Sequence, residues 1–124
     1  MILVRRLPTE PELGFNQAST LRAVVVEGPQ RISSLATRLG VSQPAMSQMV
    51  DRLVDEGWVH RRPVAEDRRA VEVVATPEGA ETVSRRRASR GRSLDRLVAQ
   101  LTEDEQERLR AALPALQRLS QLLP

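Results

Sequence analysis

The segment from Ser42 to Leu53 carries the side chains best suited to contact another molecule. At about 100° per residue, the rotation of an α-helix, one side of this segment gathers short polar groups and one proline: Gln43, Pro44, Ser47, Gln48 and Asp51. The other side gathers Met46, Met49, Val50 and Leu53, the pattern of a stripe that faces a core. Hydroxyls and amides donate and accept at base edges in the major groove of DNA. The segment therefore indicates a helix that reads DNA, with an ordinary amphipathic helix as the alternative.

A second charged group lies between two strand-like runs, Trp58–Arg62 and Ala70–Ala75, in a predicted loop from Pro63 to Arg69. An Arg at the tip of a hairpin is attracted by the negative potential of a narrow minor groove. An Asp two residues away, as Asp67 is from Arg69, limits the rotamers of that Arg. Three further basic side chains add charge for phosphates: Arg61, Arg62 and Arg68. The hairpin is predicted to contact DNA; the alternative is a solvated basic hairpin.

Composition excludes several classes of site. The chain of 124 residues has no Cys and a single His, so thiolate sites and clusters of His within one chain are impossible. Paired carboxylates such as Asp51/Asp55 and Glu103/Asp104 lack a His, Cys or Gly-rich loop to complete an active site. We therefore predict no enzyme activity, no metal and no cofactor, and the sequence identifies no cofactor-binding residue. No apolar run approaches the roughly 20 residues that span a bilayer, so we predict no membrane contact and a cytoplasmic protein.

The balance of charge differs along the chain. Between Arg31 and Arg92 there are 12 Arg against 8 acidic residues, whereas the C-terminal part is balanced or slightly acidic. A basic half beside a neutral half suits a protein with one face toward phosphates. The basic run from Arg85 to Arg92 is expected to be a solvated face, the usual role of charge runs.

Helix signals place the polar segment within a helix-turn-helix. One helix is predicted from an N-cap at Asn16 to Gly28-Pro29, followed by a very short strand at Arg31-Ile32. Ser33 is the expected cap of a second helix that ends at Gly40. Ser42 caps the third helix, with Pro44 in its first turn, and Gly57 ends it. Three helices followed by a β-hairpin make a winged helix-turn-helix, so the fold class is mainly α with a small β-hairpin wing.

The flanking segments complete the predicted organisation. Residues 1–15 form a loose N-terminal arm, residues 16–76 the winged helix-turn-helix, and residues 77–124 C-terminal helices that serve dimerisation. Thr76 caps a long helix that reaches about Gln100, and Gly91 is its weak point. Thr102 and Glu105 form a capping box for a last, Leu-rich helix that Pro114 should kink.

Taken together, the motifs resemble the MarR family of bacterial transcription regulators. The resemblance runs from about Asn16 to Gly79 and rests on Gly28-Pro29, Ile32-Ser33-Ser34-Leu35-Ala36, the stretch from Leu39 to Ser47, Val50-Asp51-Arg52-Leu53, Gly57, Asp67-Arg68-Arg69 and Thr76-Pro77-Glu78-Gly79. It implies a homodimer on a palindromic operator in double-stranded DNA, and a regulator that acts as a repressor.

The resemblance also implies roles for single residues. The recognition-helix contacts would be Ser42, Gln43, Pro44, Ser47 and Gln48, with Arg52 near a phosphate. In the wing, Asp67 and Arg69 match the family's Asp-x-Arg pair, in which the carboxylate steadies an Arg that enters the minor groove. Members usually begin with a long helix that joins the dimer interface. Here only about 15 residues precede Asn16, so that helix is expected to be missing or shortened.

Two further expectations stay open. Family members often bind small aromatic effectors, but this chain offers only Phe15 and Trp58 as aromatic residues, and Trp58 is expected to pack under the wing. An effector is therefore possible, with its identity unknown. The alternative function is a winged-helix interaction module, or an antagonist that dimerises with a related regulator without binding DNA itself.

Overall fold

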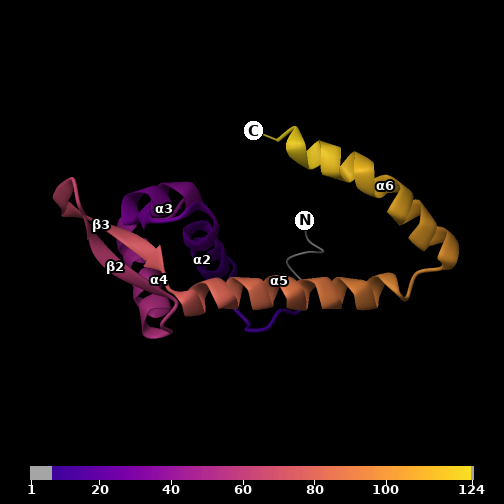
Figure 1. Ribbon diagram of the computed structural model, residues 1–124, viewed down its shortest axis with the longest axis horizontal. Helices are drawn as coiled ribbons and strands as arrows, with labels where there is room; N and C mark the ends of the chain where they lie inside the picture. The colour runs from indigo at the N-terminus through magenta and orange to yellow at the C-terminus, as the bar shows by residue number, and fades with distance from the viewer. Residues whose placement is uncertain (1–6, 124) are drawn as a thin grey trace. The chain divides into compact units, whose positions relative to one another are not determined.

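The computed structural model describes residues 7–123, apart from the side chain of Arg68, and divides the chain into two compact units, residues 1–90 and 91–124. The first unit contains α2 (Phe15–Glu27), α3 (Ile32–Leu39) and α4 (Gln43–Asp55) together with a small antiparallel sheet (Figure 1). The long helix α5 (Pro77–Val98) begins in the first unit and ends in the second, which also contains α6 (Glu103–Gln121). The predicted class, mainly α with a β-hairpin wing, is confirmed.

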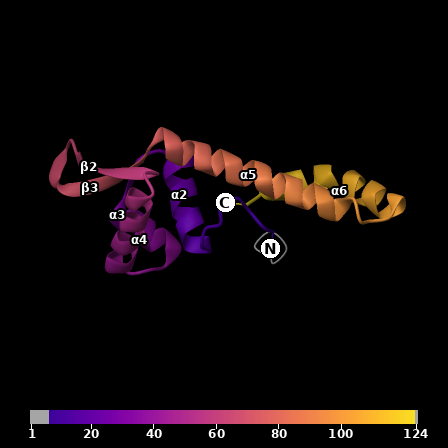
Figure 2. The same cartoon turned by 90° about the horizontal axis from the view of Figure 1, so that it is seen from below.

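The sheet has the strand order β1-β3-β2, with β1 at Gln30–Arg31, β2 at Val59–Val64 and β3 at Asp67–Ala75. We call the first unit the winged unit; Figure 2 shows β2 and β3 as a paired ribbon that extends beyond its helices. The predicted loop from Pro63 to Arg69 is wrong, because only residues 65 and 66 separate the strands. Pro63 does not end β2, since this is an edge strand, where a residue without an N–H is tolerated.

The register of the hairpin changes near its tip. Pro63 pairs with Val71, but the next residue, Val64, pairs with Asp67. Residues 68–70 therefore bulge from β3 between these two pairs. Bulges of this kind redirect side chains, and this one contains Arg69.

One apolar cluster holds the winged unit together. It joins residues from every helix of the helix-turn-helix and from both long strands: Leu21, Val24, Leu35, Ala36, Met46, Val50, Leu53, Val59 and Val73. Each large member contributes roughly 1.5–3 kcal/mol through burial. Met49 and Trp58 are partly buried and pack against the cluster. The predicted core stripe of α4 is thus confirmed, with Met49 at its edge.

The helix caps agree with the sequence at four positions and differ at two. Ser42 Oγ accepts from Ala45 N at 3.2 Å, Gly40 adopts the left-handed conformation, and Thr102 and Glu105 form the capping box. Thr76 Oγ1 accepts from Gly79 N at 3.0 Å at the start of α5. The caps predicted at Asn16 and Ser33 are wrong: Gly14 precedes α2 and Arg31 precedes α3, each without a capping side chain. β1 pairs with β3 immediately before α3, so the sheet orients the chain where this helix begins.

A close backbone contact joins the start of α5 to the turn between α4 and β2. Thr76 N donates to Trp58 O at 3.0 Å, and Thr76 Oγ1 donates to Gly57 O at 2.6 Å. A Cβ added at Gly79 would lie 2.0 Å from Trp58 O. Gly79 is therefore required for the first turn of α5 to approach this carbonyl.

The N-terminal arm packs along the first part of α5. Residues 7–14 form no helix or strand, and residues 1–6 lie outside the described part of the chain. Leu7 is buried, Glu10 N donates to Ser89 Oγ at 3.1 Å, and Arg86 donates to Pro11 O. Arg86 is only 8% exposed, so the prediction of a solvated basic run is wrong at this residue. The arm covers it, which no pattern of charge indicates.

The C-terminal unit has a different character. Helix α6 is continuous through Pro114, and none of its residues is buried. Leucines at helical spacing form an exposed apolar stripe, which we call the leucine stripe: Leu109, Leu113, Leu116 and Leu119. None of the described helices is long and apolar enough to cross a membrane.

Candidate nucleic-acid interface

The polar side of α4 faces away from the core. Gln43, Pro44 and Gln48 are exposed, and Ser47 is half-buried. Ser42 is exposed at the N-cap, and Arg52 is exposed in the last turn. The buried stripe of α4 fixes the rotation of the helix, so the amides at its N-terminal end point outward. These are the groups that the sequence singled out, and the structure brings them together.

The wing presents Arg69 from the bulge in β3. Asp67 Oδ1 accepts a hydrogen bond from Arg69 N at 3.0 Å. The carboxylate therefore holds the backbone of the bulge, as in an Asx turn. The sequence predicted that Asp67 would steady the Arg69 side chain; the contact in this structure is to its backbone N–H instead. The Arg69 side chain is exposed.

Two other wing arginines have protein partners. Arg61 Nη1 lies 2.6 Å from Asp51 Oδ1, and Arg61 Nη2 donates to Ser47 O at 3.1 Å and to Ser47 Oγ at 3.3 Å. Arg62 Nε lies 2.5 Å from Glu72 Oε1, across the hairpin. Arg61 thus contacts α4, whereas Arg62 contacts its neighbouring strand. Neither arrangement could be read from the sequence.

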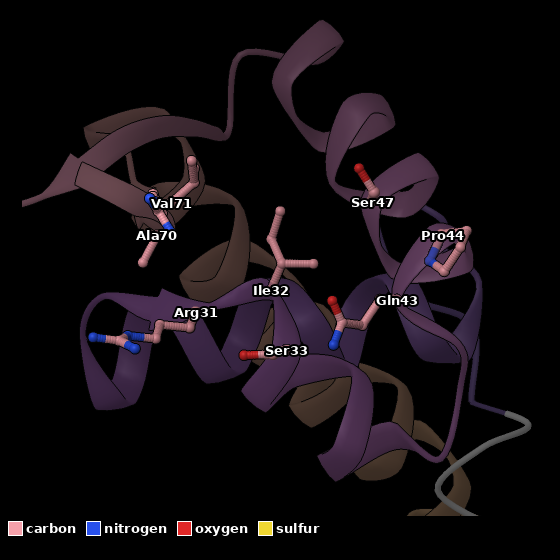
Figure 3. Close-up of a pocket in the computed structure, with 9 residues that line it drawn as sticks. Arg31, Ile32, Ser33, Gln43, Pro44, Ser47, Ala70 and Val71 are labelled. Carbon is pink, nitrogen blue, oxygen red and sulfur yellow. The ribbon is translucent and has the colours of Figure 1, made fainter. Parts of the chain in front are cut away.

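A groove connects α4 with the wing. Figure 3 shows Gln43, Pro44 and Ser47 of α4 on one side and Ala70 and Val71 of β3 on the other. We call it the recognition groove; its volume is about 550 Å³, and it is lined by Arg31, Ile32, Ser33, Gln43, Pro44, Ser47, Arg69, Ala70 and Val71. From the sequence, Arg31 was expected in a short strand and Ser33 at a helix cap, and neither was expected in a binding surface. They reach the groove because β1 pairs with β3 and α3 begins directly after it.

The chemistry of the groove is that of a polyanion-binding surface with hydrogen-bonding groups. Arg31 and Arg69 supply positive charge, and the α4 side chains supply hydroxyl and amide groups. Within residues 7–123, no group of acidic residues and His is placed to hold a metal ion. The groove can therefore bind phosphates electrostatically and base edges by hydrogen bonds.

Comparison with known proteins decides the family. A family model described as MarR family matches residues 15–71. An uncharacterized HTH-type transcriptional regulator of Mycobacterium bovis is 35% identical over 107 residues, which cover 86% of this chain and 74% of that protein. The chain belongs to the MarR family.

Other MarR-family proteins agree in sequence and in fold. The multiple antibiotic resistance protein MarR of Salmonella typhimurium is 38% identical over 68 residues, 54% of this chain and 47% of that protein. The crystal structure of a transcriptional regulator from Thermotoga maritima matches with a TM-score of 0.74 and 26% identity, over 87% of this chain and 76% of that one. A mutant of MarR from E. coli matches with a TM-score of 0.71 and 28% identity, over 93% and 85%. This MarR-family chain is therefore a transcription regulator of the winged helix-turn-helix type and not an enzyme.

A second cavity of this MarR-family protein lies beneath the N-terminal arm. Its volume is about 560 Å³, and its lining combines apolar side chains with two arginines and two acidic residues: Leu7, Leu13 and Phe15 with Arg22, Arg86, Glu10 and Glu12. Burial lowers the pKa of the Arg86 guanidinium from its ordinary value, and the positive charge of Arg90 lowers it further. A guanidinium removed from water in this way binds an anion more strongly than an exposed one.

Proposed function

We propose that this regulator is a sequence-specific repressor in which α4 enters the major groove of DNA and the wing enters the adjacent minor groove. The observation that carries the proposal is the recognition groove, in which the polar side of α4 and Arg69 line one continuous surface. In this arrangement Gln43, Ser47 and Gln48 face base edges. Arg69 follows the minor groove, while Ser42, Arg52 and Arg62 lie toward the DNA backbone.

The leucine stripe supports a homodimer on a palindromic operator. Leu113, Leu116 and Leu119 are exposed by 47%, 51% and 61%, a row of apolar groups that a second copy can bury. An interface between two copies of one chain is commonly two-fold symmetric. Two recognition helices related by such an axis read inverted half-sites about one helical turn apart.

The proposal is tested by selecting bound sequences from random double-stranded DNA and measuring affinity for the selected site. We expect an inverted repeat, and we expect Gln43→Ala and Arg69→Ala each to lose about 1–3 kcal/mol of specific binding. Arg38→Ala serves as the control, because Arg38 is exposed, pairs with Glu27 and does not line the groove.

Two results would contradict the proposal. One is an operator that both groove variants bind as tightly as the parent chain does. The other is a gel shift of DNA that occurs only when a related regulator is added, which would support the alternative function of an antagonist that dimerises with that regulator. Repression itself is measured as reporter transcription from a promoter that carries the selected site; an increase on adding the regulator would make it an activator.

The cavity beneath the arm supports a small anionic effector. Arg22 and Arg86 would hold its negative group against the opposing charges of Glu10 and Glu12, and Leu13 and Phe15 its apolar body. Benzoate is a suitable probe, with benzamide as the uncharged control of the same shape. We expect benzoate alone to raise the unfolding temperature and to weaken operator binding. Equal effects of the two compounds, or none, would argue against this site.

A further inference from the structure

Among the described residues, Arg61 is the one wing arginine whose side-chain hydrogen bonds and ion pair all go to the recognition helix α4. It belongs to β2, and its guanidinium reaches Asp51 Oδ1 at 2.6 Å, Ser47 O at 3.1 Å and Ser47 Oγ at 3.3 Å. Its side chain is 31% exposed. One guanidinium therefore connects the base of the wing with two successive turns of α4.

We infer that Arg61 is a positioning residue for DNA recognition. It fixes the wing against α4, and it donates to Ser47 Oγ so that the Ser47 hydroxyl is left to donate its own proton to DNA. The inference rests on the proposed function and deepens it. It also differs from the sequence-based expectation that Arg61 contacts a phosphate.

The first part of the inference concerns the orientation of the wing. A two-stranded hairpin beyond the core has little stability of its own, and Val59 at its base is buried, whereas Arg62 and Pro63 farther along are exposed. A planar guanidinium with several donors can fix both distance and angle, which an ammonium group cannot. The contacts of Arg61 hold the hairpin at one angle before DNA is bound. Arg62 cannot do this, because its partner Glu72 lies on the same hairpin.

The second part concerns the polarity of Ser47. A hydroxyl has one proton to donate and two lone pairs to accept. Ser47 Oγ accepts from Arg61 Nη2, and in residues 7–123 no recorded hydrogen bond uses the Ser47 proton. Because Ser47 lines the recognition groove, that proton is available to the ligand. At this position the regulator should select an acceptor on the base edge, such as guanine O6 or N7 or thymine O4.

Asp51 gives the contact a further role. Its carboxylate is on the same side of α4 as Gln43 and Ser47, and an unpaired negative charge there would repel phosphates. The ion pair with Arg61 neutralises it. This explains how an acidic residue is accommodated on a DNA-facing side.

The decisive variant is the double substitution Arg61→Gln/Asp51→Asn, which removes the contact without changing net charge. The matched control is Arg38→Gln/Glu27→Gln, a charge-neutral loss of an exposed ion pair between α2 and α3. Each is measured on the selected operator and on unrelated DNA over a series of salt concentrations. Hydrogen exchange of the β2 and β3 amides is measured in the free protein.

We expect the ratio of specific to non-specific affinity to fall about 100-fold, which is the loss of one base contact of roughly 1.4 kcal/mol in each half-site. The dependence on salt should stay the same, because no phosphate contact is lost. Selection should lose its preference for an acceptor at one position of each half-site, and amides of the wing should exchange faster. The control should show none of these changes.

Arg61→Lys keeps the inference testable even if the double variant is unstable. Lys preserves the charge but not the planar fork, so we expect the same loss of specificity as in the double variant. A phosphate contact would instead survive this change.

Three outcomes would overturn the inference. Arg61→Lys could bind as the parent chain does while Arg61→Gln weakens all sequences equally and lowers the salt slope by about 1.8, the signature of one lost phosphate contact in each half-site. Unchanged hydrogen exchange in the wing would remove the positioning role. Failure of the parent chain to select any sequence would instead disprove the proposed function, and the inference with it.

Discussion

Met46, Val50 and Leu53 of α4 are completely buried, whereas Leu113, Leu116 and Leu119 of α6 keep between 47% and 61% of their surface exposed. Both helices are amphipathic, and both begin at a hydroxyl cap. The difference lies in what covers the apolar side. In the winged unit the chain covers it by itself, so the polar side of α4 is left for a ligand. In the C-terminal unit the apolar side is exposed and needs a further surface.

The largest effect should come from charging the leucine stripe. Leu113→Asp/Leu116→Asp would place two carboxylates in the proposed interface, where burial without a partner is costly. We expect a monomer by sedimentation, and a loss of operator affinity of about 100-fold or more, because the two half-sites are no longer bound together.

The control for this change is Ala111→Asp/Gln121→Asp, which adds the same two charges. At about 100° of rotation per residue, both positions lie on the side of α6 opposite the leucine stripe. It should remain dimeric. A parent chain that sediments as a monomer at all concentrations would show that α6 is covered in some other way.

Removing single leucines sharpens the comparison. Leu53→Ala should lower the free energy of unfolding by about 2–5 kcal/mol, since it leaves a cavity in a closed core. The loss of unfolding free energy caused by Leu116→Ala should depend on protein concentration, because Leu116 is buried only when two chains associate. Urea unfolding at two concentrations separates the cases. If both costs were independent of concentration, α6 would be packing against its own chain.

Two glycines test how tightly each unit is packed. Gly79→Ala should cost about 1–3 kcal/mol, because the new methyl group meets the Trp58 carbonyl and the backbone must shift. Gly91→Ala meets no atom within 4 Å and should stabilise α5 by up to about 1 kcal/mol. Thermal unfolding of the two variants should therefore shift in opposite directions. A shift in the same direction would contradict the packing described for Gly79.

The smallest difference is expected at the caps. Ser42→Ala removes the acceptor for Ala45 N and should cost about 1 kcal/mol in global unfolding, because α4 belongs to the core. Thr102→Ala removes an equivalent acceptor from α6, where we expect faster hydrogen exchange in the first turn and little change in the unfolding of the winged unit. Equal global effects would mean that the two units unfold together.

Much of the winged unit was predictable from local signals. Ser42, Gly40 and Thr76 act through hydrogen bonds or dihedral angles within a few residues, so their roles are readable from sequence. The cap expected at Ser33 failed because β1 pairs with β3 and α3 begins directly after it. The cap expected at Asn16 failed because α2 already begins at Phe15, after Gly14. The hairpin loop was misjudged at Pro63, since only the strand order shows that β2 is an edge.

The residue types of the candidate site were predictable from the sequence, but the contacts between its residues were not. Helical periodicity alone placed Gln43 and Gln48 on an outward side. That Arg61 contacts Ser47 and Asp51, and that Arg31 lines the same groove as Arg69, depends on how β2 and β1 lie against the helices. Charge alone made Arg61 and Arg62 look alike.

The sequence by itself determined which side of each helix is apolar, where most helices begin, and that a basic hairpin follows the helix-turn-helix. Those properties arise from periodicity and short-range hydrogen bonds, which neighbouring residues specify. Only the tertiary structure decided which arginines are engaged by carboxylates and hydroxyls, that the arm covers Arg86, and that residues from three separate segments share one groove. Those contacts join residues distant along the chain, and they form only after the apolar core has set the position of every element.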